Sequence, residues 1–275
     1  MLKVSVIVPT LAEAHLRYLL RALSQQVIKP YEVVLVIKGD NKFVEGLCDR
    51  YGLRQIILSQ SHGYFTHALN MGKSEASGDI LIFTDADAMP PKGWVKKYVK
   101  LHEAYPRIAG IGSRDIYVDA NSLRLLRTPD DLIHVRLYRH FIVPVFKWPH
   151  PLLNKYKLGV YLTKSLHIVH GLGIPNKTCY SLLFRGVNMS FKASYASDMW
   201  FPEHPLLKRA PGNEQYFGLQ FVLKGLDAIY VPDNPVLHIA REESLSRTER
   251  HGGLERELEV MRSLCRELIT RYNGL

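Results

Sequence analysis

Short apolar runs and segments with helical spacing alternate through the first third of the chain. Four runs rich in β-branched residues have the composition of strands buried on both faces of a parallel sheet, at residues 4–8, 32–37, 55–58 and 80–83. Between them, apolar residues recur every three or four positions, which predicts helices over residues 16–27 and 65–76 and a weaker helix ending near residue 51. This order predicts an α/β fold with a doubly wound, mostly parallel sheet.

The rest of the chain adds fewer regular elements. We expect a helix over residues 94–105, a strand over 108–116, a strand near 187–191, a helix over about 213–224 and a strand over 228–232. Apolar positions from Leu254 to Leu268 predict an amphipathic C-terminal helix that packs on the sheet. The predicted organisation is one domain over residues 1–240, interrupted by a loop-rich insertion at 118–184 and followed by this helix within residues 241–275.

Composition narrows the setting of the protein. The chain has 275 residues and a formal net charge of +10, which favours anionic partners such as nucleotides, phosphorylated lipids or anionic membranes. Its three cysteines, Cys48, Cys179 and Cys265, are scattered and odd in number, so a reducing environment without disulfides is the default. No apolar run approaches the roughly 18 residues of a membrane span. We expect a cytoplasmic protein, either free or peripheral at the inner membrane face.

The insertion concentrates the positive charge. Residues 121–180 hold nine Lys or Arg against two acids, Asp130 and Asp131, so they contribute +7 of the total +10. Aromatic residues such as Tyr138, Phe141 and Trp148 lie between the charges, a mixture that suits an interface between water and lipid. No segment has the pattern of a base-recognition module, so nucleic acid is not an expected partner. The insertion is either a solvated basic surface or the place where a membrane-associated acceptor is met.

Two carboxylates follow the fourth apolar run. If the strand continues through Thr84, Asp85 and Asp87 point to the same face, with side-chain bases roughly 7 Å apart. That spacing suits two neighbouring tasks, such as holding a divalent cation that grips phosphate oxygens and holding a sugar hydroxyl. The alternative is a polar strand end that leads into the turn around Pro90.

In a doubly wound sheet, ligands bind beyond the carboxyl ends of the strands. Polar groups follow all four of the first predicted strands and should meet at this edge. They are Pro9 and Thr10 with Glu13, then Asp40, the loop that contains Gly63, and Asp85 with Asp87. Asp40 has an equally simple alternative role as the first residue of an Asx turn.

The residues Asn70-Met71-Gly72, the run 76–87 that ends in the carboxylate pair, and then Pro91 and Trp94 form one continuous pattern. This pattern resembles the inverting family 2 glycosyltransferases, which have the GT-A fold. The resemblance covers residues 4–94 and returns between Arg185 and His238. It implies a nucleotide-sugar-binding half at residues 1–117 and an acceptor-side half at 185–240.

The resemblance also implies roles for individual residues. Asp87 matches a metal ligand, His238 matches a third metal or diphosphate ligand in some relatives, and Glu214 matches the aspartate that acts as the base. Alternatives are a surface role for His238 and a helix-dipole role for Glu214 in the first turn of its helix. Ala12 and the single acid Asp40 depart from the family pattern, so the nucleoside stays open. The implied nucleotide-sugar contacts are Pro9, Thr10, Glu13, Asp40, Gly63, Asp85 and Asn188.

The function implied is transfer of a hexose from a nucleotide diphosphate sugar to an acceptor hydroxyl, with inversion and with Mg²⁺ or Mn²⁺, in glycan or glycolipid synthesis. The acceptor is expected to be a saccharide or a lipid-linked molecule. A sugar-1-phosphate nucleotidyltransferase is one rival, but it should carry a Gly-rich loop with Arg where this chain has Pro9-Thr10-Leu11-Ala12. A non-catalytic nucleotide-sugar-binding protein is the other.

Overall fold

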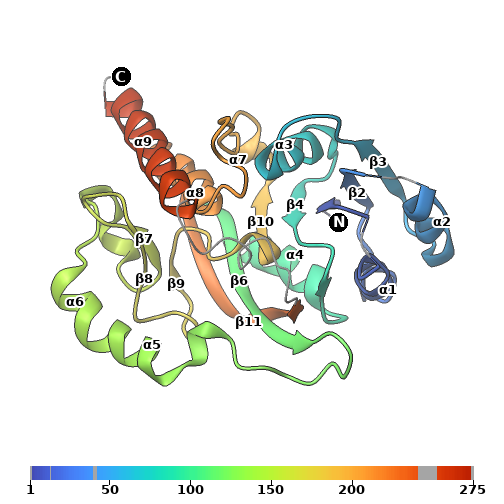
Figure 1. Cartoon of the computed structure of the whole chain (residues 1–275), viewed down its shortest axis with the longest axis horizontal. Coiled ribbons are helices and arrows are strands. Elements are labelled where there is room, and N and C mark those ends of the chain that lie inside the picture. Colours follow the sequence, from blue (N-terminus) through green and yellow to red (C-terminus); the bar gives the residue numbers. More distant parts are fainter. Residues whose placement is uncertain (1, 13, 40–41, 241–252, 274–275) are drawn as a thin grey trace.

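The computed structural model describes residues 2–12, 14–39, 42–240 and 253–273. They form a nine-stranded sheet with helices on both of its faces (Figure 1). The strands are β1 (Val4–Thr10), β2 (Glu32–Ile37), β3 (Gln55–Ser59), β4 (Ile80–Phe83), β5 (Ala88–Met89), β6 (Ile108–Asp119), β9 (Cys179–Tyr180), β10 (Met189–Lys192) and β11 (Asp227–Ala240), with β7 (Val160–Leu162) and β8 (Ile168–His170) forming a separate hairpin. The helices are α1 (Leu16–Ser24), α2 (Lys42–Tyr51), α3 (Phe65–Glu75), α4 (Trp94–Ala104), α5 (Ile133–Leu137), α6 (Val143–Phe146), α7 (Ala193–Ala196), α8 (Asn213–Leu223) and α9 (Gly253–Asn273).

The sheet is mostly parallel, which confirms the predicted fold class. Its order is β3-β2-β1-β4-β10-β6-β11-β5, and β9 pairs with β11. The pairings make β3, β2, β1, β4, β6 and β11 run in one direction, while β10, β5 and β9 run against them. The antiparallel strand β10 lies in the middle, between β4 and β6, and so joins the two halves of the sheet.

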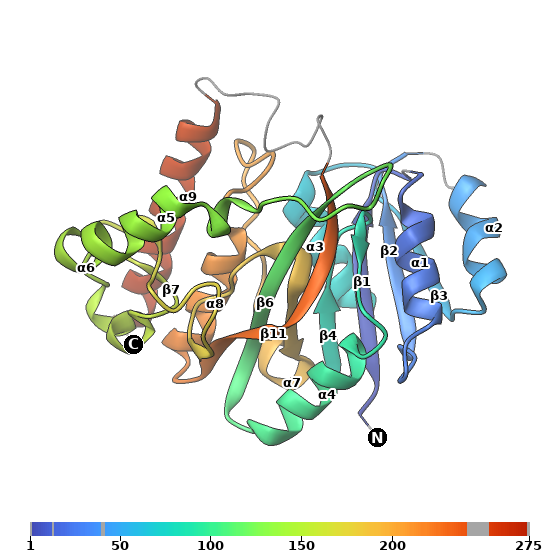
Figure 2. The same cartoon turned by 90° about the horizontal axis from the view of Figure 1, so that it is seen from below.

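Helices cover both faces of the sheet because alternate strand residues point to opposite sides. In β1, Val4, Val6 and Val8 belong to a core shared with α1, α2 and α4. Ile7 points the other way, into a core with α3 and α8. Figures 1 and 2 show α1 and α4 on one side of the sheet and α3 on the other. The all-apolar composition of the first strands therefore reflects burial on two faces.

The last sheet strand is longer than the apolar pattern predicts. The expected strand over residues 228–232 extends to Ala240, because a register shift between Val231 and Val236 lets the chain pass Pro232 and Pro235 before pairing resumes. Proline has no N–H to give to a ladder, so it is tolerated at such an irregularity. As a result His238 does not follow the strand but lies within it, opposite Ala88 of β5 and Tyr117 of β6.

The insertion has a hydrophobic core that it shares with the C-terminal helix. Leu153, Tyr156 and Leu162 pack in one cluster with Met261 and Cys265 of α9, and residues of α8 complete this cluster. The C-terminal amphipathic helix is confirmed, but it lies against the insertion and α8 and not on the sheet itself. Figures 1 and 2 both place α5, α6, the β7–β8 hairpin and α9 together at the end of the molecule away from β3.

The close packing of α3 on the sheet gives a test of the fold. A Cβ on Gly72 of α3 would lie 2.4 Å from Cγ2 of Ile7 in β1. We expect Gly72→Ala to lower the free energy of unfolding by about 1–3 kcal/mol through overpacking, measured by urea denaturation. Gly46 of α2 is the matched control, because a Cβ there meets nothing within 4 Å and Gly46→Ala should be neutral or stabilise by at most about 1 kcal/mol. Equal stability of the two variants would contradict this packing.

Candidate active site

The carboxyl ends of β1, β2 and β3 lie side by side and form the edge at which the sequence predicted the donor contacts. The register pairs Thr10 with Ile37 and Ile37 with Ser59, so the loops that follow the three strands start at the same level. Lys38 Nζ donates a hydrogen bond of 3.0 Å to the Gly63 carbonyl and joins two of these loops. Gly63 has a φ of +77°, and a Cβ there would lie 2.7 Å from His67, so only glycine fits.

Other predicted donor residues have different surroundings. Thr10 is buried, and its Oγ1 accepts a hydrogen bond of 3.1 Å from the Ala12 N–H. Pro9 lies in β1 beside Val36 of β2 and is half-buried. Glu13 and Asp40 lie outside the described residues, so the structure gives no position for their side chains. The part of this edge that is described is therefore built from Pro9, Thr10 and the Gly63 loop.

Asp85 and Asp87 converge through a turn and not through a strand. β4 ends at Phe83, one residue before the extension that the spacing suggested, and the Ala88 N–H donates to the Asp85 carbonyl at 3.1 Å. This turn brings one carboxylate oxygen of each aspartate and one ring nitrogen of His238 within 4.8 Å of one another. The predicted strand extension is therefore wrong, and the turn brings oxygens of the two carboxylates close enough to share one ligand.

His238 lies between two carboxylates. Its Nε2 is 3.3 Å from Oδ1 of Asp87, and its Nδ1 is 3.0 Å from Oδ2 of Asp115. Burial by itself lowers the pKa of His238, but the hydrogen bonds with Asp115 and Asp87 raise this pKa to about 11. The carboxylates of Asp87 and Asp115 therefore favour positive charge at this point, and a metal ion bound at Nε2 would take the place of its proton.

The three-residue cluster fits a divalent metal by its ligand chemistry. Carboxylate oxygens are the usual ligands of Mg²⁺ and Mn²⁺, and an imidazole nitrogen is acceptable to Mn²⁺. A histidine that ligates a metal commonly gives its other ring nitrogen to a carboxylate, which fixes the ring orientation. Asp115 occupies that position against His238. Asp85, Asp87 and His238 would hold the ion.

Asp115 is a site residue that sequence reasoning missed. It lies in β6, only 3% exposed, and accepts hydrogen bonds of 3.0 and 3.1 Å from Arg185 Nη1. Burial raises its pKa, but the His238 hydrogen bond and the charge of Arg185 bring this pKa below its ordinary value. The only sequence signal was an acid inside a predicted strand, directly after Ser113 and Arg114.

Arg185 extends these contacts into the insertion. Its second nitrogen, Nη2, lies 2.5 Å from Oδ2 of Asp130, and the other oxygen of Asp130 accepts from Arg139. Although burial opposes the charge of Arg185, the two carboxylates raise its pKa above the ordinary value. A continuous line of hydrogen-bonded charges thus connects the metal cluster with the start of the insertion.

The short turn at residues 185–188 makes hydrogen bonds both with Thr84, which precedes Asp85, and with Glu214. On one side, Thr84 Oγ1 donates to the Val187 carbonyl at 2.8 Å. On the other side, the Gly186 N–H donates to Oε1 of Glu214 at 2.9 Å. Glu214 lies in the first turn of α8, as predicted, and is partly buried. Burial raises its pKa, while the Gly186 N–H and the charge of Arg185 act in the opposite direction.

Asn188, the last residue of this turn, fixes the turn through four side-chain hydrogen bonds. Its Oδ1 accepts from Trp94 Nε1 at 2.9 Å and from the Tyr98 hydroxyl at 2.7 Å. Its Nδ2 donates to the carbonyls of Arg114 and Asn234 at 2.8 and 2.9 Å. The side chain is fully buried, so a direct contact of Asn188 with a donor sugar would require it to give up one of these bonds.

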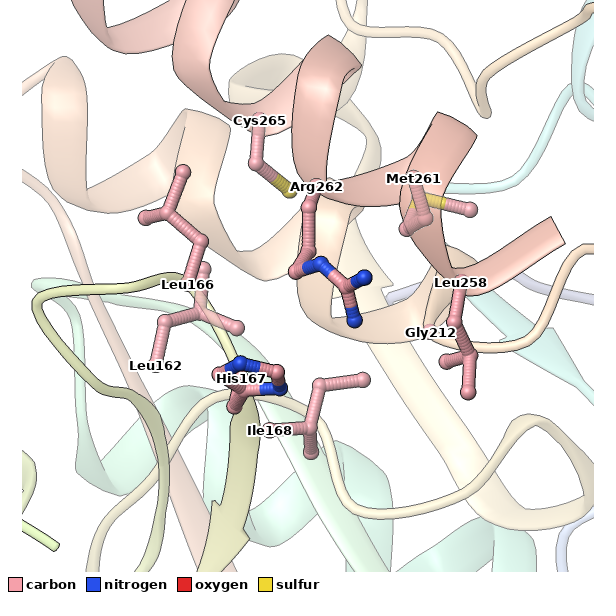
Figure 3. Close-up of a pocket in the computed structure, with 9 residues that line it drawn as sticks. All are labelled: Leu162, Leu166, His167, Ile168, Gly212, Leu258, Met261, Arg262 and Cys265. Carbon is pink, nitrogen blue, oxygen red and sulfur yellow. The ribbon is translucent and has the colours of Figure 1, made fainter. Parts of the chain in front are cut away.

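A cavity of about 150 Å³ lies elsewhere, between the β7–β8 hairpin and α9 (Figure 3). Its walls are mainly apolar, with the side chains of His167 and Arg262 among them. Gly212, two residues before Glu214, also lines it, but Asp85, Asp87 and His238 do not. This cavity is therefore separate from the metal cluster.

Solved structures with the same fold include several glycosyltransferases. Staphylococcus aureus TarS 1–349 in complex with UDP-GlcNAc is 18% identical with a TM-score of 0.59, and the alignment covers 95% of this chain and 65% of that one. The mannosyltransferase PcManGT from Pyrobaculum calidifontis, in complex with GDP-Man and Mn²⁺, is 18% identical with a TM-score of 0.57, covering 96% and 70%. GalNAc-T7 with UDP, GalNAc and Mn²⁺ is 14% identical with a TM-score of 0.63, covering 88% and 44%.

At these identities the structures show a shared fold, which confirms the GT-A prediction. The chain spans 60% of the length of a further TarS 1–349 structure. No curated protein matches the chain in sequence. The family description "Glycosyl transferase family 2" matches residues 5–173, which is more than half of the chain. The match includes the turn that carries Asp85 and Asp87, and we conclude that this chain belongs to glycosyl transferase family 2.

Proposed function

We propose that the protein is an inverting glycosyltransferase that moves a sugar from a nucleotide diphosphate sugar to an acceptor hydroxyl. One observation carries this proposal. The turn at residues 185–188 bonds through Val187 to Thr84, which precedes the cluster of Asp85, Asp87 and His238, and through Gly186 to the partly buried Glu214. Such an arrangement offers a cation site for a diphosphate and, across the turn, a carboxylate for an acceptor proton.

The reaction is a direct displacement. The acceptor oxygen attacks the anomeric carbon, the bond from that carbon to the diphosphate oxygen breaks with its electron pair, and Glu214 takes the hydroxyl proton. The raised pKa of Glu214 suits a general base, because a more basic carboxylate holds the proton better. When bound, Mg²⁺ or Mn²⁺ would supply positive charge for the departing diphosphate.

The donor is proposed from both the edge residues and the comparisons. Pro9, Thr10 and the Gly63 loop line the edge where ligands of such sheets bind, beside Asp85. Glu13 and Asp40 are proposed to join them from outside the described residues. The solved structures that carry UDP-GlcNAc or GDP-Man support a nucleotide diphosphate sugar as the donor class.

The acceptor is proposed to be a saccharide or a lipid-linked molecule, in glycan or glycolipid synthesis. Arg185 of this turn pairs with Asp130 of the basic insertion, and its neighbour Gly186 donates a hydrogen bond to Glu214. The proposed location is the cytoplasm, with peripheral contact at the inner membrane face.

A thermal-shift screen with UDP-, GDP- and dTDP-sugars, with and without Mn²⁺, tests the donor class. A donor at about 100 times its Kd should add about 2.7 kcal/mol to the free energy of unfolding. Turnover is then measured as release of the nucleoside diphosphate in the presence of saccharide or lipid-linked acceptors. Binding without release on any acceptor would favour a non-catalytic binding protein, and release of pyrophosphate from a sugar-1-phosphate and a nucleotide would favour a nucleotidyltransferase.

We predict that Asp87→Ala abolishes the Mn²⁺-dependent part of nucleotide-sugar affinity in calorimetry. The fold should persist, because His238 keeps its hydrogen bond with Asp115 and the turn retains its backbone bonds. Asp198→Ala is the control, since Asp198 is an exposed aspartate paired with Lys224. An Mn²⁺-dependent affinity that is the same in the parent and in Asp87→Ala would rule out this metal site.

We predict that Glu214→Gln keeps the donor Kd and loses roughly 10²- to 10⁴-fold in kcat, the usual range for a general base. Because the pKa of Glu214 is raised, kcat/KM of the parent should fall with decreasing pH at a pH above the ordinary glutamate value of 4.5, and this limb should vanish in the variant.

The matched control for the base is Glu203→Gln. Glu203 bonds to His67 and Asn70 of α3, so its loss should leave kcat within a factor of three. If Glu214→Gln stays within that factor and Glu203→Gln does not, the base is Glu203.

A further inference from the structure

The outer side of the insertion carries large apolar side chains that face solvent. Residues 133–146 form one continuous helical segment, made of α5, a π-helical turn (Tyr138–Ile142) and α6, at the edge of the molecule (Figures 1 and 2). We define the apolar ridge as six exposed side chains of this segment and the residues just after it: Ile133, Leu137, Phe141, Val145, Phe146 and Trp148. Their exposure ranges from 50% for Leu137 to 74% for Ile133. Soluble surfaces rarely gather apolar groups in this way unless they meet a partner.

The ridge is a regular feature of the helical segment. Ile133, Leu137, Phe141 and Val145 recur every four residues, which places them along one side of a helix. Arg139 and Val143, on the opposite side, are buried against the rest of the insertion. The segment is thus amphipathic with its apolar stripe turned away from the fold.

The charges around the ridge have one sign. The two acids between residues 121 and 180 are both paired with arginines: Asp130 with Arg139 and Arg185, and Asp131 with Arg114 at 2.7 Å and with Arg136 at 3.4 Å. Basic side chains remain on the outside, and Lys157 lies over the Trp148 ring at 4.9 Å from its centre. The surface therefore combines apolar and positively charged groups.

The charged side chains on the inner side of the same segment are also positive. It lines a cavity of about 400 Å³ together with β8, and the polar side chains there are Tyr138, Arg139, Lys147, His167 and His170. None of the described residues that line this cavity is acidic. Arg139 is paired with Asp130, and Lys147 adds a second positive charge on this inner side.

We propose that the ridge inserts into the surface of an anionic lipid bilayer, with the exposed Arg136 and Lys157 at the level of the lipid phosphates. An anionic bilayer has an apolar interior that can bury the ridge and a negatively charged surface that attracts the basic side chains. A second copy of the chain would bring the same positive charges against each other. Among the described residues, no helix has the length and apolar composition of a membrane span, so the contact proposed is with one leaflet.

Docking by the ridge would also orient the catalytic edge. Asp130 lies just before the helical segment, and through Arg185 it is connected to Asp115 and hence to His238. This deepens the proposed function and rests on it in one respect, that the acceptor presented there is lipid-linked. The docking itself requires no turnover.

Co-sedimentation with large vesicles tests the docking. One set of vesicles is pure phosphatidylcholine, and the other contains about 30% phosphatidylserine to mimic an anionic leaflet. The full chain should bind only the anionic vesicles, and binding should weaken strongly at high salt because exposed charges are screened. Phe141→Ser with Phe146→Ser should weaken binding at least about tenfold, since both rings lose apolar burial. Lys157→Glu should weaken it by about fivefold or more.

The matched control is Val27→Ser with Leu206→Ser, two exposed apolar residues outside the insertion, which should bind like the parent. Equal or negligible binding to both vesicle types would overturn the proposal, as would a Phe141→Ser, Phe146→Ser variant that binds like the parent. So would sedimentation velocity showing a dimer that this variant alone disrupts. Vesicle binding without sugar transfer would count against the proposed function only, and transfer to a soluble acceptor without vesicle binding would count against the docking only.

Discussion

The buried carboxylate of Asp115 is the group on which the site depends. It accepts hydrogen bonds from His238 on one side and from Arg185 on the other, and so fixes two strands and the turn at residues 185–188 relative to one another. A carboxylate this deeply buried is stable only with such partners, and removal of one partner from a buried ion pair typically costs about 3–5 kcal/mol. The orientation of the His238 ring, and with it the metal cluster, follows from this pairing.

The turn at residues 185–188 does most of its positioning through backbone groups. Gly186 offers its N–H to Glu214, and Val187 offers its carbonyl to Thr84, which precedes the carboxylate turn. Asn188 then ties this turn to α4, β6 and the irregular part of β11 with all of its amide groups. Because these contacts do not depend on ligands, the two halves of the site are held in place before any substrate binds.

The inner and outer sides of the insertion differ in charge. Its acids face inward, where Asp130 joins the ion pairs of the site, and its core is completed by α8 and α9. Its outward side keeps the excess positive charge and the exposed apolar side chains. The insertion is therefore held to the site by ion pairs on its inner side, and its outer side is not needed for that attachment.

Local patterns in the sequence determined the sheet strands of the first half, their helices, the carboxylate pair and the place of Glu214, because strand burial and helical spacing depend on neighbours in the chain. Tertiary structure decided what joins these parts. His238 and Asp115 are 123 positions apart, and Asn188 reaches Trp94 across 94 positions, so no local pattern marks either contact. The length of β11 depended on a register shift against β6. The position of α9 depended on a hydrophobic core that it shares with the insertion. These features depend on burial and pairing between distant segments, which only the folded chain brings together.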